Sequence, residues 1–177
     1  MKLGNTQDVL NKYGKYVVQQ SKSNLTKDNK GGGELYNSVK YVLDVESDAF
    51  LIAFLMEEYG AYVDEGVKGA NPSLVKGGYQ KAPNSKFKYT NKMPPMQILA
   101  DWAKSKKIRF RNAKGQYAKG SNRSMGFALQ KSIYAQGLRG NKFFTKPLEK
   151  GLKILSPELA KSFALDVENA IILGIKK

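Results

Sequence analysis

Two neighbouring stretches decide the fold of this chain, Leu35-Tyr-Asn-Ser-Val-Lys-Tyr-Val-Leu-Asp44 and Ala49-Phe-Leu-Ile-Ala-Phe-Leu-Met56. The first stretch is rich in Tyr and Val, which fit the pleated surface of a sheet. The polar segment Glu46-Ser-Asp48 between them suits a turn, so the two stretches predict an antiparallel hairpin. The nearly continuous apolar run of the second stretch predicts a strand that is buried on both faces.

Amphipathic helices are predicted before and after this hairpin. Residues 5–26 place apolar side chains at steps of three and four, and Asn5 or Thr6 can cap the first turn. The glycine-rich segment 28–33 predicts a flexible linker between this helix and the hairpin. In the C-terminal part of the chain, Ser156 is the expected cap and Pro157 the expected first residue of a last helix, because proline is tolerated where a backbone N–H would have no partner.

The positive charge of the chain is concentrated in its middle. Residues 66–157 contain 20 Lys and Arg but only two acidic residues, a net charge of +18, whereas the whole chain carries +15. Phosphates attract cations and bases stack on aromatic rings, so the cations near Trp102, Phe110 and Tyr117 fit a nucleic-acid surface. A run of charge is also typical of a solvated face or of a surface for an acidic partner. The candidate contact residues are Lys104, Lys106, Lys107, Arg109, Arg111, Lys114 and Lys119.

The middle segment is also predicted to be an insertion within a single α+β domain of residues 1–177. Residues 66–93 are rich in Gly, Pro, Asn and Lys without a persistent period, which indicates an irregular segment. Residues 94–106 and 122–136 have helical spacing, residues 107–119 suggest a small basic hairpin, and a glycine-rich turn follows. The predicted fold has N- and C-terminal helices packed on a small, mostly antiparallel sheet, with a basic helical and hairpin subdomain inserted over residues 66–141.

The composition excludes several kinds of catalytic site. The chain has no Cys and no His, which excludes disulfides, thiolate zinc sites and an imidazole base. Paired carboxylates gather at Glu57, Glu58, Asp64 and Glu65, where a nuclease, a glycosidase or a bound cation would need them. A solvated or partner-facing edge is the favoured interpretation, and no catalytic residue, metal or cofactor is expected. No apolar run reaches the roughly 20 residues of a membrane span.

The segment Tyr59-Gly-Ala-Tyr62-Val63-Asp64-Glu65-Gly66 is the first of three short motifs in this chain. Together they resemble segments of a family of small tail-completion proteins of long-tailed bacteriophages, which sit at the head–tail junction. The first motif is similar to the family's Tyr-x-x-Tyr-Val-Glu-x-Gly-Thr, with Asp64 in place of Glu and Val67 in place of Thr. Phe143-Phe144-Thr145-Lys146-Pro147-Leu148 is similar to Pro-Phe-Leu-x-Pro-Ala, and Gly33-Glu-Leu35-Tyr-Asn-Ser38-Val39 to Gly-x-Leu-x-x-Ser-Ile. The basic middle segment departs from the family pattern, in which that stretch is much shorter.

The resemblance implies a structural protein of the virion neck or tail, assembled in the host cytoplasm as a homo-oligomeric ring. Such a ring joins head to tail in a completion, terminator or connector role. Its partners would be neighbouring neck and tail proteins and, non-specifically, the packaged DNA; no membrane partner is expected. A non-specific nucleic-acid-binding protein without a ring is the alternative.

The expected subunit interface combines the first two motifs, with the acidic Asp64 and Glu65 meeting the basic loop of the next copy in a head-to-tail contact. The interface residues are Tyr59, Tyr62, Val63, Asp64, Glu65, Gly66, Phe143, Phe144 and Pro147.

Overall fold

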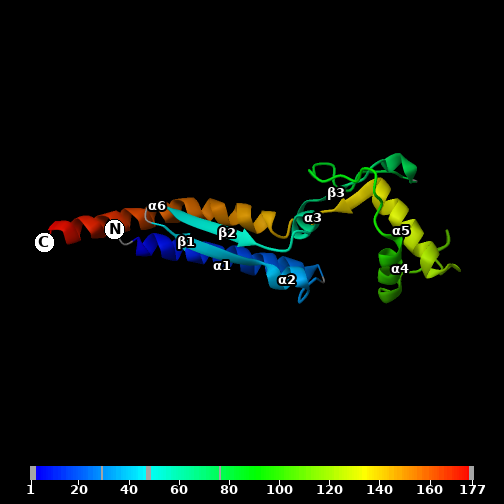
Figure 1. The fold of residues 1–177 in the computed structure, drawn as a ribbon, viewed down its shortest axis with the longest axis horizontal. Coiled ribbons are helices and arrows are strands. Elements are labelled where there is room, and N and C mark those ends of the chain that lie inside the picture. The colour runs from blue at the N-terminus through cyan, green and yellow to red at the C-terminus, as the bar shows by residue number, and fades with distance from the viewer. Residues whose placement is uncertain (1–2, 29, 47–48, 76, 176–177) are drawn as a thin grey trace. The chain divides into compact units, whose positions relative to one another are not determined.

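The computed structural model of the protein describes residues 3–28, 30–46, 49–75 and 77–175, and the chain divides into two compact units (Figure 1). Unit 1 comprises residues 1–64 and 142–177, and unit 2 comprises residues 65–141. The expected insertion, residues 66–141, has nearly the same bounds as unit 2. N- and C-terminal helices and a small antiparallel sheet confirm the predicted α+β class.

Unit 1 is built on two long antiparallel helices, α1 (Gly4–Lys27) and α6 (Thr145–Ile175) (Figure 1). At one end, Asn5 of α1 contacts Asp166 of α6. At the other end, the side-chain amide of Asn24 donates to the carbonyl of Phe143 over 3.1 Å, just before α6 begins. The two helices therefore form the single helical layer of this unit.

The predicted hairpin forms from β1 (Lys40–Val45) and β2 (Phe50–Leu55), which pair antiparallel with Lys40 opposite Leu55 and Val45 opposite Phe50. Of the predicted turn, Ser47 and Asp48 lie outside the described residues, and the N–H of Glu46 donates to the carbonyl of Ala49 over 2.9 Å.

The first predicted strand is too long, because its start forms the short helix α2 (Glu34–Ser38). This helix buries Leu35 in a core cluster with Leu25, Val39 and Phe143. Burial of one leucine against the helices outweighs the local strand preference of this segment.

One face of the hairpin, the inner face, packs on the helices. The ring of Tyr41 lies against Gly14 of α1, and Phe54 contacts Tyr13 edge-on with ring centroids 6.0 Å apart. Directly opposite residues share a face, so Lys40, Val42, Asp44, Leu51, Ala53 and Leu55 form the other face, here called the outer face.

The expectation that the second strand is buried on both faces is wrong. On the outer face, Leu51 and Leu55 are 56% and 43% exposed. The helices of unit 1 pack against the inner face alone, so the apolar run of β2 has only one buried side.

The first turn of α1 is capped by Asp166 rather than by its own Asn5 or Thr6, which corrects the predicted local cap. The Asp166 carboxylate accepts hydrogen bonds from the N–H groups of Asn5 and Thr6 over 3.1 and 2.9 Å and from both side chains. Burial alone would raise the pKa of Asp166, but the bonds from Thr6 and Asn5 outweigh it and hold the pKa below its ordinary value of 3.8. The contribution of the ionised Asp166 to the free energy of unfolding is therefore present above pH 3.8 and is lost as the pH falls through the lowered pKa.

Helix α6 begins at Thr145, well before the predicted start at Ser156 and Pro157. Pro157 lies inside the helix, and the hydroxyl of Ser156 donates to the carbonyl of Leu152 over 3.2 Å. A serine followed by a proline is the usual local signal of a helix start. Here the helix continues through it, because α6 packs along α1 on both sides of this point.

Unit 2 contains a short antiparallel pair, β3 (Gly66–Lys68) and β4 (Gly137–Arg139), and two helices, α4 (Met96–Ser105) and α5 (Asn122–Gln136). The predicted glycine-rich turn thus forms β4, while both predicted helices are present. A side chain at Gly126 of α5 would place its Cβ 2.7 Å from that of Ala100, so glycine lets α4 and α5 approach closely.

The segment between β3 and α4 is largely irregular, as predicted, apart from a 3₁₀ turn, η1 (Pro72–Leu74). Hydrogen bonds hold it in place: Lys68 accepts from Tyr89 and donates to Phe87, and the side chain of Gln80 bonds both the N–H and the carbonyl of Gly69. None of the described helices combines the length and the apolar composition that a bilayer span requires.

Replacing Gly14 by alanine should destabilise unit 1 by about 1–3 kcal/mol, the usual cost of overpacking a core. A Cβ at Gly14 would lie 2.6 Å from Cε2 of Tyr41, whose ring is held by Phe54 and by a hydroxyl bond to Asn11. The matched control is Gly4→Ala in the same helix, where a Cβ would meet no atom within 4 Å. Urea denaturation followed by circular dichroism measures both changes, and equal stability of the two variants would contradict the packing described.

Candidate functional site

The segment that carries the Tyr-x-x-Tyr-Val motif folds as a short helix, α3 (Gly60–Glu65). Gly60 is buried, and a Cβ there would lie 2.8 Å from the sulfur of Met56. Val63 packs against the core cluster of unit 1, whereas Tyr59 and Tyr62 are 42% and 48% exposed. Tyr59, just before the helix, and Tyr62, within it, are therefore at the surface, while Gly60 and Val63 are packed in the core.

Asp64, at the end of this segment, is a buried cap for the start of α6. Asp64 is only 5% exposed. Its Oδ1 accepts hydrogen bonds from the N–H groups of Phe144 over 2.7 Å and of Thr145 over 3.2 Å. Oδ2 accepts a hydrogen bond from the hydroxyl of Thr145, and the backbone carbonyl of Asp64 accepts one from the N–H of Lys142 over 2.9 Å. A carboxylate here accepts hydrogen bonds from N–H groups that a helix start leaves unpaired, and its negative charge interacts favourably with the helix dipole.

This geometry leaves only part of the expected subunit interface at the surface of the chain, and the interface itself stays a prediction. Asp64, Gly66, Phe143 and Pro147 are buried within the chain, and Phe143 has no exposed surface. Val63 and Phe144 are partly buried and pack against the core, and Glu65 forms an ion pair with Lys86 at 2.9 Å. The burial of Asp64 follows from its role, since a cap must lie close to the N–H groups that it satisfies. Tyr59 and Tyr62 are the residues of the set that remain exposed.

The four carboxylates of the acidic cluster do not converge. Asp64 is occupied by the start of α6 and Glu65 by Lys86, while Glu57 and Glu58 are exposed. Within the described residues, no group of three or more acidic side chains is arranged to hold a metal ion. The arrangement provides a helix cap and a surface ion pair.

The seven candidate cations between Lys104 and Lys119 all lie in unit 2. All seven candidate cations between Lys104 and Lys119 have exposed side chains, and none of them makes an ion pair with a described residue. Unit 2 as a whole has 16 Lys and Arg against two acidic residues, a net charge of +14. The remaining residues of the chain are therefore close to neutral, with +1 of the total of +15.

The predicted basic hairpin is reduced to one bridge between Arg111 and Tyr117, closed by a turn at Gly115. The guanidinium carbons of Arg109 and Arg111 lie 5.8 and 5.0 Å from the centre of the Tyr117 ring, within cation–π distance. Tyr117 is 66% exposed. The ring therefore positions two guanidinium groups at the surface without neutralising them.

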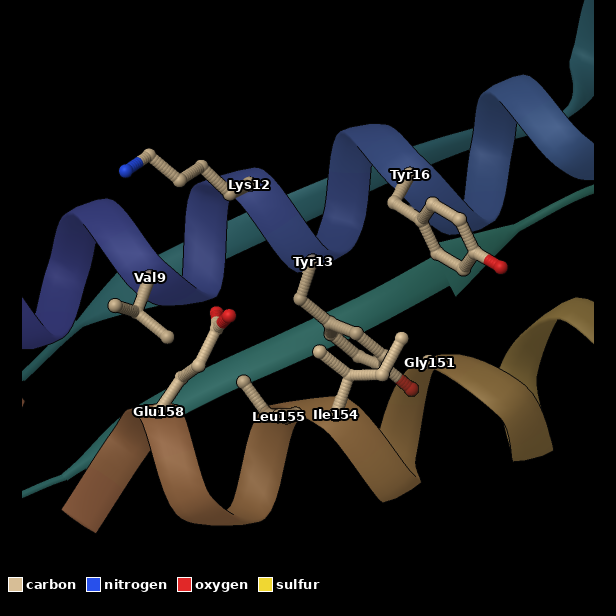
Figure 2. Close-up of a pocket in the computed structure, with 8 residues that line it drawn as sticks. All are labelled: Val9, Lys12, Tyr13, Tyr16, Gly151, Ile154, Leu155 and Glu158. Atoms are coloured by element: carbon tan, nitrogen blue, oxygen red, sulfur yellow. The ribbon is translucent and has the colours of Figure 1, made fainter. Parts of the chain in front are cut away.

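A narrow groove of about 170 Å³ runs between α1 and α6, and Figure 2 shows the Tyr13 ring within it. A Cβ at Gly151 of α6 would lie 2.7 Å from that ring, so the glycine admits the tyrosine. The buried Tyr13 hydroxyl has no hydrogen-bond partner among the described residues, and burial raises its pKa. The groove is lined mainly by apolar side chains, with Lys12 and Glu158 at its edge (Figure 2). It is therefore a packing seam of the helix pair rather than a site equipped for catalysis.

Large apolar side chains are exposed over much of unit 1, and reasoning from the sequence missed this surface. Besides the outer face, helix α6 exposes Phe163, Leu165 and Ile171 to between 50% and 58%. The alternation Lys40, Val42, Asp44 in the first strand was the signal that one face of the hairpin is not buried, since charged residues recur on that face.

No family model, curated protein or solved structure matches this chain.

Replacing Asp64 by alanine should lower the free energy of unfolding by about 1–3 kcal/mol, because buried N–H groups at the start of α6 lose their acceptor. Asp64→Asn keeps one oxygen acceptor and should cost less. The control is Glu58→Ala, which removes an exposed carboxylate of the same cluster and should stay within about 0.5 kcal/mol of the wild type. Chemical denaturation of all three variants tests the cap, and an Asp64→Ala variant as stable as Glu58→Ala would exclude it.

Proposed function

We propose that this protein is a structural subunit of the neck or tail of a tailed bacteriophage, which assembles with copies of itself into a ring joining head to tail. The observation that carries the proposal is the amount of large apolar surface that unit 1 leaves exposed, on the outer face and along α6. Apolar patches of this kind on a soluble protein mark interaction surfaces.

The architecture of unit 1 supports an assembly role. A two-stranded hairpin is marginally stable by itself and depends on packing against other elements. In unit 1 the helices cover the inner face, and the outer face keeps Leu51, Leu55 and Val42 exposed. A subunit of this design gains buried apolar area when it associates, and association is what a structural virion protein performs.

The resemblance of the motifs to tail-completion proteins supports assembly in the neck or tail of a phage. Tyr59 and Tyr62, the exposed residues of the first motif, have rigid rings with a polar tip, which are favoured in interfaces between proteins. We assign these two rings to contacts with neighbouring copies or with other neck and tail proteins. The buried residues of the motifs have a supporting role, since Asp64 fixes α3 against the start of α6.

Light scattering coupled to size-exclusion chromatography tests assembly directly. The expected result is a mass that is a multiple of 19.7 kDa and rises with concentration, with closed rings visible by negative-stain electron microscopy. The double variant Tyr59→Ser/Tyr62→Ser should shift the distribution towards smaller species, whereas Tyr117→Ser, an exposed tyrosine of unit 2, should not. A wild-type protein that remains at 19.7 kDa at every concentration would refute the assembly role.

Non-specific nucleic-acid binding by unit 2 is the second candidate function, and a separate observation favours it. A net charge of +14 within residues 65–141 repels itself unless an anionic partner neutralises it. The guanidinium groups of Arg109 and Arg111 on Tyr117 are arranged to meet phosphates. In a head–tail channel, sequence-independent attraction to the passing genome would suffice.

The double variant Arg109→Ala/Arg111→Ala should weaken DNA binding and flatten its salt dependence, since each lost phosphate contact lowers the slope of log K against log salt by about 0.9. Lys12→Ala/Lys15→Ala removes the same charge from exposed positions of unit 1 and should leave the slope unchanged. Fluorescence anisotropy with a labelled duplex at several salt concentrations measures both. Absence of binding at low salt would reject this second function.

A further inference from the structure

The outer face of the hairpin has a charge pattern that is complementary to itself. Along β1 it presents Lys40, Val42 and Asp44 in turn, and opposite them on β2 lie Leu55, Ala53 and Leu51. One end of the face is therefore cationic, the other is anionic, and the middle is apolar. Val42, Leu51 and Leu55 are 39%, 56% and 43% exposed, and both charged residues are exposed as well.

The two charges of this face have no ion-pair partner within the part of the chain that the structure describes. Four residues of extended strand separate Lys40 from Asp44 by about 13 Å, too far for an ion pair between them. Neither residue makes an ion pair with any residue in the described part of the chain. Each charge therefore has no counter-charge among the described residues, and each lies beside an apolar surface that is exposed to water.

We infer that the outer face binds the outer face of a second copy, across a two-fold axis that runs perpendicular to the strands at the level of Val42 and Ala53. That operation lays β1 across β1 of the second copy in the opposite direction. Lys40 of each copy then faces Asp44 of the other at both ends of the contact, Val42 meets Val42, and Leu51 meets Leu55. Sheets stacked face to face lie about 10 Å apart, a gap that a lysine and an aspartate side chain together can span.

Charge complementarity selects a second copy over other occupants. The face is neutral, with one lysine and one aspartate, so it does not fit a polyanion or a strongly acidic protein. An anionic lipid surface would repel the carboxylate of Asp44. A second copy that runs in the opposite direction presents the same residues in reverse order, so that both charges meet an opposite charge. An isologous contact produces this arrangement.

The inferred contact goes beyond the proposed function. A closed ring is built from head-to-tail contacts, whereas this contact is two-fold, and the two combine in a pair of rings with dihedral symmetry. Six residues from each copy cover less than the roughly 800 Å² per partner that a typical stable interface buries. The outer face is therefore expected to determine orientation and to associate weakly unless other contacts assist.

A charge-exchange series tests the contact. Lys40→Asp brings two carboxylates together at each end, and Asp44→Lys brings two ammonium groups together, so either change should raise the dissociation constant of the self-association roughly tenfold or more at low salt. The double variant Lys40→Asp/Asp44→Lys restores opposite charges and should return the dissociation constant to near the wild-type value. Sedimentation equilibrium measures all four proteins, and circular dichroism verifies that each is folded.

Crosslinking provides a second readout that does not depend on the charge variants. The chain has no cysteine, so Val42→Cys introduces a single thiol at the inferred axis, where a short bismaleimide should join two copies. Ile98→Cys, at an exposed position of unit 2, is the control and should crosslink much less. Equal crosslinking of the two variants would overturn the inference.

The outcomes separate this inference from the proposed function. A wild type that assembles but is insensitive to the charge series, or a double variant that is not restored, overturns the two-fold contact and leaves the ring intact. A wild type that is monomeric at every concentration overturns both.

Discussion

Unit 1 depends on the carboxylate of Asp64, which ends α3 and begins α6. By accepting the N–H groups of Phe144 and Thr145, it determines where the last helix starts, and its carbonyl receives the N–H of Lys142, where the chain returns to unit 1. That start places Phe143 in the core beside Leu25 and Leu35. Asp166 performs the corresponding task for α1, so each of the two long helices receives its cap from a residue distant in the sequence.

The two units divide the chemistry of the chain between them. Unit 2 carries +14 of the net charge, and unit 1 carries most of the packed aromatic core together with a broad exposed apolar surface. Association through apolar surface and attraction of a polyanion are different physical tasks, and the proposed function assigns one to each unit.

Local sequence patterns located much of the fold and less of the site. The helix over residues 122–136 has the predicted bounds, because Ser121 caps it locally and accepts the N–H of Ser124. The start of α6 was misplaced, because the signal at Ser156 and Pro157 is local whereas the cap that operates, Asp64, is not. The same limit applies to the expected interface residues, because the spacing of a sequence motif does not reveal which of its side chains are buried.

The sequence by itself determined the α+β class, the hairpin, the helical segments and the concentration of positive charge, since these follow from propensity, periodicity and composition along the chain. Only the tertiary structure decided which face of the hairpin is covered, which carboxylate caps which helix, and which motif residues reach the surface. The physical reason is that burial, and the capping by Asp64 and Asp166, are relations between residues far apart in the chain. Asp64 and Thr145 satisfy one another only because the fold brings them together.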